Sequence, residues 1–562
     1  MVDLGKLELP FRGHDEGLES LNKGNYREIL KFLGKYNTGM QLHLLKVDEA
    51  QKANRRVFSG MSPTIQNDLI ESVGNVMLME IRKEVTEAQF VAVMLDETTD
   101  NDNISQLSTT LRYTNDEGCV IERFIEFTNV STNRTAAALY KILDNFIQDW
   151  GFADKFIGQG YDGAAVMSGD VGGLQALVKK KYTMAMYLHC VCHIFNLCLK
   201  DVLKFIKKCR IFFTSLDGFA SFFQNSPART SALDEIVQKR FPRMIHIRWS
   251  YTGNLVSTVH DHRTGLLELY EYIIDNPDKF TDDTCLKARG LKSYLHDFDF
   301  IFQLVMHGRL FRHTDMLFKI FQQAGVSVLE VQKTIDSTLL FLNEQLTMFD
   351  EVYAEAETLI SENVEPPRAQ RRRENKEDYE TLYLNVVNII IRQVQERFAA
   401  VKSISFVDLL NPVCYTDYKS KFPSSKLDDL EKCYPRIFDL SRLKTQLTFI
   451  YSNPEYAKMS LQQVFTHLSD PVRRSAFSEV RKLCALILTL PSTTVRVECT
   501  FSALDRIKDY SRTSMLNKRL NGLSLMGIEK RLLVRLQNRH NFDDMVIREY
   551  LSKPRMLELT YK

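Results

Sequence analysis

The chain has 562 residues, and its 73 Lys and Arg against 71 Asp and Glu give a formal charge of +2, which by itself identifies no partner. A hydrophobic fraction of 44% with only 24 Gly and 14 Pro excludes a disordered or fibrous chain and favours a helix-rich folded protein. The longest apolar run, 483–490, is far shorter than the roughly 20 residues of a membrane span. The N-terminus lacks a signal-peptide pattern, so we expect an intracellular protein with reduced cysteines and no membrane partner.

Apolar spacing in the first half of the chain predicts a helical segment over 1–85 and then alternating strands and helices over 86–264. The expected strands are 90–95, 106–113, 120–127, 156–162 and 184–188, and the expected helices are 136–150, 163–181 and 193–206. This order, a three-strand meander followed by crossover helices, predicts a ribonuclease-H-like mixed sheet.

The second half of the chain shows almost only helical spacing. We expect an all-α insertion over 265–470, followed by a segment, 471–562, that completes the core. In that last segment the spacing predicts a helix over 471–490, a second from Ser492 and a third through 525–536. The expected fold class is α/β plus all-α: a ribonuclease-H-like mixed sheet interrupted by a large all-helical insertion.

Two aspartates follow apolar strands that should be neighbours in this sheet. Asp96 ends the first strand and Asp162 ends the fourth. Carboxylates at adjacent strand ends can share Mg²⁺, which takes one or two protein carboxylates together with substrate phosphates. The alternative is that each aspartate is a turn residue at a strand end.

Five motifs in order resemble the hAT transposase superfamily. They are Val93-Met-Leu-Asp96-Glu-Thr-Thr-Asp100, Gly158-Gln-Gly-Tyr-Asp162, His189-Cys-Val-Cys-His193, Arg248-Trp249, and Leu490-Pro-Ser-Thr-Thr-Val-Arg-Val-Glu498. The start of the chain, Phe11-Arg-Gly-His-Asp-Glu16 with Asn22-Lys-Gly-Asn25, looks like the transposase-like domain of that family's vertebrate genome-derived branch. The resemblance covers about residues 10–550.

The resemblance implies a catalytic Asp-Asp-Glu triad formed by Asp96, Asp162 and Glu498 and binding Mg²⁺ or Mn²⁺. In such enzymes the metal supports DNA strand cleavage and strand transfer. Glu498 follows Asp162 by 336 positions, so an inserted domain would have to leave the core and return to it.

Other residues of these motifs suggest contacts around such a site. Cys190 and His193 match a Cys-x-x-His signature, and we expect His193 to contact the site or a phosphate, the alternative being a core histidine. No second ligand pair follows at zinc spacing, so zinc is not expected. Beside Arg248, Trp249 could stack on an unpaired base, or it could be a core aromatic residue.

Between 501 and 540 nine Lys and Arg stand against three acids. We expect Arg506, Lys508, Arg512, Lys518 and Arg519 to contact DNA phosphates, although a charge run can also be a solvated helix face. The apolar residues Leu525, Ile528, Leu532 and Leu536 resemble the family's C-terminal dimerisation region, with burial inside one chain as the alternative.

The family's N-terminal BED-type zinc finger has no counterpart here, because no Cys-x-x-Cys precedes Cys119. The first hypothesis is therefore a DNA transposase, and the second a domesticated, non-catalytic nuclear protein that dimerises and binds DNA or other proteins. A host ribonuclease-H-like nuclease is a more distant third.

Overall fold

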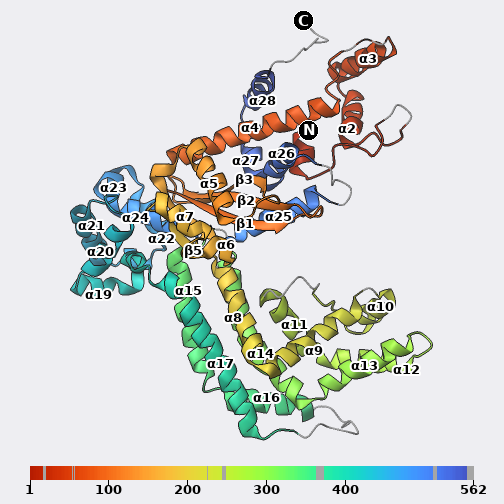
Figure 1. Cartoon of the computed structure of the whole chain (residues 1–562), viewed down its shortest axis with the longest axis vertical. Coiled ribbons are helices and arrows are strands. Elements are labelled where there is room, and N and C mark those ends of the chain that lie inside the picture. Colours follow the sequence, from red (N-terminus) through yellow and green to blue (C-terminus); the bar gives the residue numbers. More distant parts are fainter. Residues whose placement is uncertain are drawn as a thin grey trace. The chain divides into compact units, whose positions relative to one another are not determined.

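The computed structural model describes residues 1–16, 20–53, 55, 57–224, 226–242, 249–323, 325–361, 373–509 and 515–553. The chain forms two compact units, which Figure 1 shows with their elements labelled. Unit 1 consists of residues 1–190 and 405–562, and unit 2 of residues 191–404. These boundaries differ from the expected limits of the insertion at 265 and 470. Helical spacing reveals that a segment is a helix but not which body it packs against.

A five-stranded mixed sheet forms the centre of unit 1. Its strands are β1 (Val91–Thr99), β2 (Ser105–Thr114), β3 (Val120–Asn129), β4 (Phe156–Tyr161) and β5 (Met186–His189). The strand order is β3-β2-β1-β4-β5, with β2 antiparallel to both β1 and β3, and with β4 and β5 parallel to β1. The expected ribonuclease-H-like mixed sheet is thereby confirmed.

The helices of unit 1 come from both ends of the chain. The N-terminal ones are α1 (Val2–Lys6), α2 (Asn25–Gly34), α3 (Thr38–Lys52), α4 (Pro63–Glu87), α5 (Ala136–Trp150), α6 (Ala165–Ser168) and α7 (Leu174–Lys181). The C-terminal ones are α19 (Tyr415–Ser420), α20 (Ser424–Cys433), α21 (Leu440–Ser452), α22 (Leu461–Leu468), α23 (Pro471–Ala476), α24 (Ser478–Thr489), α25 (Val495–Ile507), α26 (Asn517–Ile528), α27 (Lys530–Gln537) and α28 (Phe542–Leu551).

Unit 2 is helical throughout the part that the structure describes. Its helices are α8 (Val191–Phe205), α9 (Lys207–Phe223), α10 (Pro227–Ile236), α11 (Trp249–Asp261), α12 (Arg263–Asp275), α13 (Asp282–Leu295), α14 (Phe298–Phe321), α15 (Val328–Gln345), α16 (Phe349–Ser361), α17 (Lys376–Arg397) and α18 (Ala399–Lys402). An all-helical insertion between the two halves of the core is therefore confirmed.

The sheet of unit 1 has helices from the C-terminal part of the chain on one face. Figure 1 shows the blue helices α25 to α27 beside the orange strands. The buried Arg112 of β2 donates to the carbonyl of Leu488 in α24 at 2.9 Å, and Thr114 bonds Thr489 at 3.1 Å. Strand residues alternate between faces, so every second residue of β2 faces these returning helices.

Two predicted helices are each interrupted in the structure. The expected helix over 471–490 breaks at Phe477 into α23 and α24, and the one through 525–536 breaks at Glu529 into α26 and α27. At the second break, the Oε1 of the buried Glu529 accepts a hydrogen bond from the backbone N–H of Phe124 at 3.0 Å. This tertiary contact leaves no local signal in the sequence.

Candidate active site

The two aspartates lie at the same level of the sheet. The parallel pairing of β1 with β4 places Met94 opposite Gly160, so two residues further on Asp96 is level with Asp162. Both aspartates are half-buried. Strand β1 does not end at Asp96 as expected but continues to Thr99, paired with β2 and no longer with β4. Asp96 therefore lies just beyond the last residue of β1 that pairs with β4.

Helix α25 brings Glu498 to this edge of the sheet. The helix packs against β1 and β2, and the Ser108 and Thr500 hydroxyls form a hydrogen bond of 2.9 Å between strand and helix. Ser108 is the residue directly opposite Asp96 in β2. The Ser108–Thr500 hydrogen bond therefore links the strand residue opposite Asp96 to the helix residue two positions after Glu498.

Both ends of α25 are also held by side chains. At its start, the backbone N–H of Thr494 donates to the buried Cys190 Sγ at 3.4 Å. At its end, the Lys508 ammonium contacts Asp100 at 2.6 Å and Asp102 at 2.7 Å. Cys190 therefore acts on the segment that carries Glu498, a role that its sequence motif did not indicate.

Two glycines of the Asp162 motif allow the loop before α25 to reach β4. A Cβ on Gly158 would lie 2.8 Å from Pro491, and one on Gly160 would lie 3.1 Å from it. Both distances are shorter than an ordinary van der Waals contact, so a side chain would displace the loop. Gly158 and Gly160 belong to the Asp162 motif and Pro491 to the Glu498 motif. Two motifs that are far apart in the sequence therefore pack against each other.

Negative charges converge on Asp96. Burial raises the pKa of Asp96 well above its usual value, and the charges of Asp162 and Glu498 raise it further, against a hydrogen bond from the N–H of Glu97. Within the described ranges, however, no three His, Cys, Asp or Glu side chains form a group that could hold a metal ion. The donor chemistry fits a hard cation such as Mg²⁺, which needs only one or two protein carboxylates.

The remaining motif residues are only partly described. His193 is half-buried in the first turn of α8, in unit 2. Arg248 lies outside the described residues, and so does the side chain of Trp249, whose backbone begins α11. The expected contacts of these residues with the site stay predictions.

The basic residues at 501–540 largely meet acidic partners within unit 1. Lys508 is 2% exposed and ion-paired, so it is not part of a DNA-binding surface as expected. Arg506 contacts Glu8, whereas Lys518 has an 86% exposed side chain 3.9 Å from Glu71. Arg519 bonds Asn67, and Arg512 lies outside the described residues. The run of charge therefore overstates the basic surface that is free for DNA.

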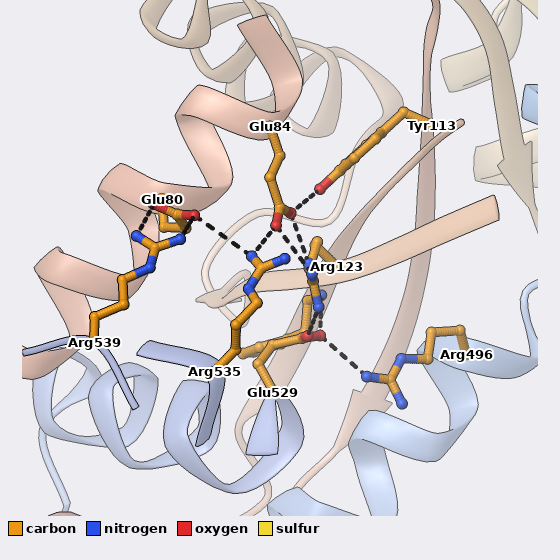
Figure 2. Close-up of polar contacts among 9 residues, drawn as sticks. Glu80, Glu84, Tyr113, Arg123, Arg496, Glu529, Arg535 and Arg539 are labelled. Atoms are coloured by element: carbon orange, nitrogen blue, oxygen red, sulfur yellow. Dashed lines mark hydrogen bonds and ion pairs between the residues drawn. The ribbon is translucent and has the colours of Figure 1, made fainter. Parts of the chain in front are cut away.

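A buried network of opposite charges lies close to α25. Arg123 of β3 contacts Glu84 of α4 and Glu529, each at 2.9 Å, and Arg496 of α25 reaches Glu529 at 3.0 Å (Figure 2). Figure 2 also shows Arg535 and Arg539 of the C-terminal basic run meeting Glu84 and Glu80. Sequence reasoning missed this network, since its members lie up to 459 positions apart.

The expected dimerisation residues are part of the core of unit 1. Leu525, Leu532 and Leu536 are at most 1% exposed, and Ile528 packs against the same apolar cluster. Helix α26 packs against α4 and β3 of its own chain. The alternative, burial inside one chain, holds for these side chains, and they do not form an exposed dimer surface.

Comparison with known proteins relates the N-terminal third to a domain family. Residues 2–173 match the ZMYM1/FAM200 RNase-like domain. The proteins called "52 kDa repressor of the inhibitor of the protein kinase" of Homo sapiens and Mus musculus are each 22% identical to this chain, over 98% of its length and 76% of theirs. Among the described helices none is long and apolar enough to cross a membrane. The RNase-like match includes β1 to β4 and both aspartates.

Proposed function

We propose that this is a transposase-derived DNA-binding protein whose Asp96, Asp162 and Glu498 form a metal-dependent site for DNA cleavage and strand transfer. The observation that supports the proposal is the convergence of Asp162 and Glu498 on the carboxylate of Asp96, whose pKa is raised by burial and further by these two charges. Carboxylates that repel one another are costly to a fold, and such perturbed groups concentrate at functional sites.

The proposed ligands of Mg²⁺ or Mn²⁺ are the carboxylates of Asp96 and Asp162, with Glu498 from α25. When bound, a divalent ion would activate the attacking oxygen and stabilise the departing one at a phosphodiester. The chain's own part is positioning: the Ser108–Thr500 bond and the Cys190 contact orient α25 and hence Glu498.

The test is a nicking and strand-transfer assay with the whole chain, Mn²⁺ and a labelled DNA duplex. Asp162→Asn and Glu498→Gln should abolish cleavage and leave DNA binding within about twofold. Glu97→Gln is the matched control, because this neighbour of Asp96 pairs with Arg134 at 2.6 Å. A folded wild-type protein that binds DNA but never nicks it would exclude the catalytic function.

A second candidate function is that of a domesticated nuclear regulator that binds DNA without cutting it. Two observations favour it: no three acidic or other ligating side chains among the described residues already form a metal group, and two relatives are named as repressors. Under this function DNA binding persists in Asp162→Asn and Mn²⁺ has no effect on the DNA. Reporter repression by the wild type and by Asp162→Asn would then be equal.

Self-association belongs to the same proposal, but through a surface other than the buried leucines. Light scattering of the purified chain measures it directly. A monomer at all accessible concentrations would remove dimerisation from the proposed function.

A further inference from the structure

The N-terminal motif Phe11–Glu16 has no part in the acidic site, but it lines a cavity of its own. A cavity of about 640 Å³ lies between this motif and the start of α26. Its lining includes Phe11, Arg12, Asn67, Glu71, Lys518 and Arg519. All of these residues belong to unit 1.

Two arginines from opposite ends of the chain meet in this cavity on one neutral atom. Arg12 Nη2 donates to Asn67 Oδ1 at 2.9 Å, and Arg519 Nη1 donates to the same oxygen. The two guanidinium groups are thus held as neighbours although their charges repel. A pair of guanidinium forks beside a cavity is a typical arrangement for a phosphate, which accepts two hydrogen bonds from each fork.

Close backbone contacts around Arg12 fix the loop in which it lies. Gly13 and the segment at Asn22–Gly24 approach so closely that a Cβ on Gly13 would lie 2.4 Å from the Asn22 carbonyl. Gly24 has a φ of +89°, which favours glycine, and Tyr26 donates its N–H to the carbonyl of Phe11 at 3.0 Å. The glycines of the motif therefore fix the loop that presents Arg12.

Arg12 also keeps hydrogen-bonding capacity. Its Nη2 donates to the carbonyl of Pro63 at 2.7 Å, but its Nε is buried without a hydrogen-bond partner in the part of the chain that the structure describes. Burial lowers the pKa of Arg12, as expected for a cation with little water around it. A buried donor without a partner costs stability, and a bound anion would relieve that cost.

The cavity has an excess of positive charge. Lys518 and the two arginines outnumber Glu71, which also contacts Lys553 at 2.7 Å. Arg519 and Lys518 lie in the first turn of α26, and this helix begins without a side-chain cap at Leu516. The positive end of the helix dipole adds to the attraction for an anion.

We propose that this cavity binds a phosphate of the DNA backbone, as a contact separate from the acidic site. The inference rests on the proposed DNA binding and adds to it a named anchoring point. Arg12 and Arg519 would hold the phosphate oxygens, and the exposed Lys518 would contact the adjoining backbone.

The test compares Arg12→Gln/Arg519→Gln with wild type by fluorescence anisotropy on a labelled duplex over a range of salt concentrations. We expect about a tenfold or larger loss of affinity, and the slope of log K against log salt should fall by about 0.9, because both arginines contact the same phosphate. The control Arg473→Gln/Arg474→Gln removes two exposed charges from α23 of the same unit and should change both quantities much less.

Loss of Arg12 could unfold the N-terminal loop, so Lys518→Gln is a second variant. Its side chain is 86% exposed, and we expect normal folding with a slope reduced by about 0.9. Equal binding by wild type, the double variant and Lys518→Gln would overturn the inference while leaving DNA binding intact. Absence of binding in the wild type would instead overturn the proposed function.

A third measurement distinguishes the DNA backbone from free phosphate. Inorganic phosphate, added at constant ionic strength, should raise the melting temperature of wild type and not of the double variant. If phosphate stabilises only the wild type while both proteins bind DNA equally, the cavity is a site for free phosphate and its assignment to the DNA backbone is wrong.

Discussion

On helix α25, Arg496 and Glu498 stand two residues apart and face charged clusters of opposite construction. Arg496 joins a network in which signs alternate, from Glu84 through Arg123 to Glu529 (Figure 2). Glu498 faces Asp96 and Asp162, where the signs are the same and the pKa of Asp96 rises. The first arrangement stabilises the fold, and the second opposes it. Charge pairing thus separates the structural carboxylates Glu84 and Glu529 from the candidate functional ones, although helix α25 contributes a residue to both clusters.

The largest effect should come from breaking the network at its most buried carboxylate. Glu529→Ala removes a side chain that is 2% exposed and contacts both Arg123 and Arg496. We expect the free energy of unfolding to fall by about 3–5 kcal/mol, because the largely buried Arg123 and the half-buried Arg496 both lose a partner. Urea denaturation measures the change. The exposed Lys83→Ala, on the same helix as Glu84, should change it by less than about 0.5 kcal/mol.

A smaller loss is expected where the loop before α25 packs on β4. Gly160→Val places a side chain against Pro491, and we expect about 1–3 kcal/mol of destabilisation from overpacking. Since this loop leads to Glu498, DNA cleavage should fall much further than stability does. Gly172→Ala, with open space around its Cβ position, serves as the control. Unchanged cleavage in folded Gly160→Val would show that the loop does not position Glu498.

At the acidic site of Asp96, Asp162 and Glu498, removing a carboxylate should stabilise the protein rather than destabilise it. Asp96→Asn removes one of the repelling charges, so we expect the free energy of unfolding at neutral pH to rise by about 0.5–2 kcal/mol. Glu529→Gln, the same chemical change in the network, should lower it. Thermal and urea denaturation of both variants provide the comparison. Destabilisation by Asp96→Asn would mean that its carboxylate, like that of Glu529, belongs to the supports of the fold.

The smallest expected effect is the loss of stability at low pH that depends on Glu84 of the network. Although burial acts in the other direction, hydrogen bonds from Arg123, Tyr113 and Arg535 lower the pKa of Glu84 below its usual 4.5. The unfolded chain therefore takes up this proton first, and stability present above pH 4.5 is lost as the pH falls through the lower native value. We expect wild type to lose more stability than Glu84→Gln between about pH 5 and pH 3, the range in which the unfolded chain takes up this proton before the folded one. Parallel pH profiles for the two proteins would contradict this contribution of Glu84.

The sequence predicted those parts of the molecule that local pattern determines. Continuous apolar runs predict the buried strands. Asp96 and Asp162 each directly follow such a run, which places both carboxylates at the same end of the sheet. Lys508 was misread because its partners, Asp100 and Asp102, lie about four hundred positions earlier. A run of charged residues predicts an exposed charged surface only when no distant residues of opposite sign pair with it.

The break at Glu529 and the limits of the helical unit were beyond sequence reasoning for a related reason. A glutamate in a helical pattern is ordinary, and this one is buried among distant partners, the N–H of Phe124 and the side chains of Arg123 and Arg496. Likewise, helices α8 to α11 look no different in sequence from those of unit 1, although they belong to unit 2. Packing between distant segments decides both features.

The return of the C-terminal helices to the N-terminal sheet sets an order of events during protein synthesis. Glu498 leaves the ribosome 336 residues after Asp162. At about 5–20 residues per second this is roughly 15–70 s, during which the face of the nascent sheet that α24 and α25 later cover has no partner. A chain that stops early would carry both aspartates and no third carboxylate. The proposed three-carboxylate site is therefore complete only after translation has passed α25.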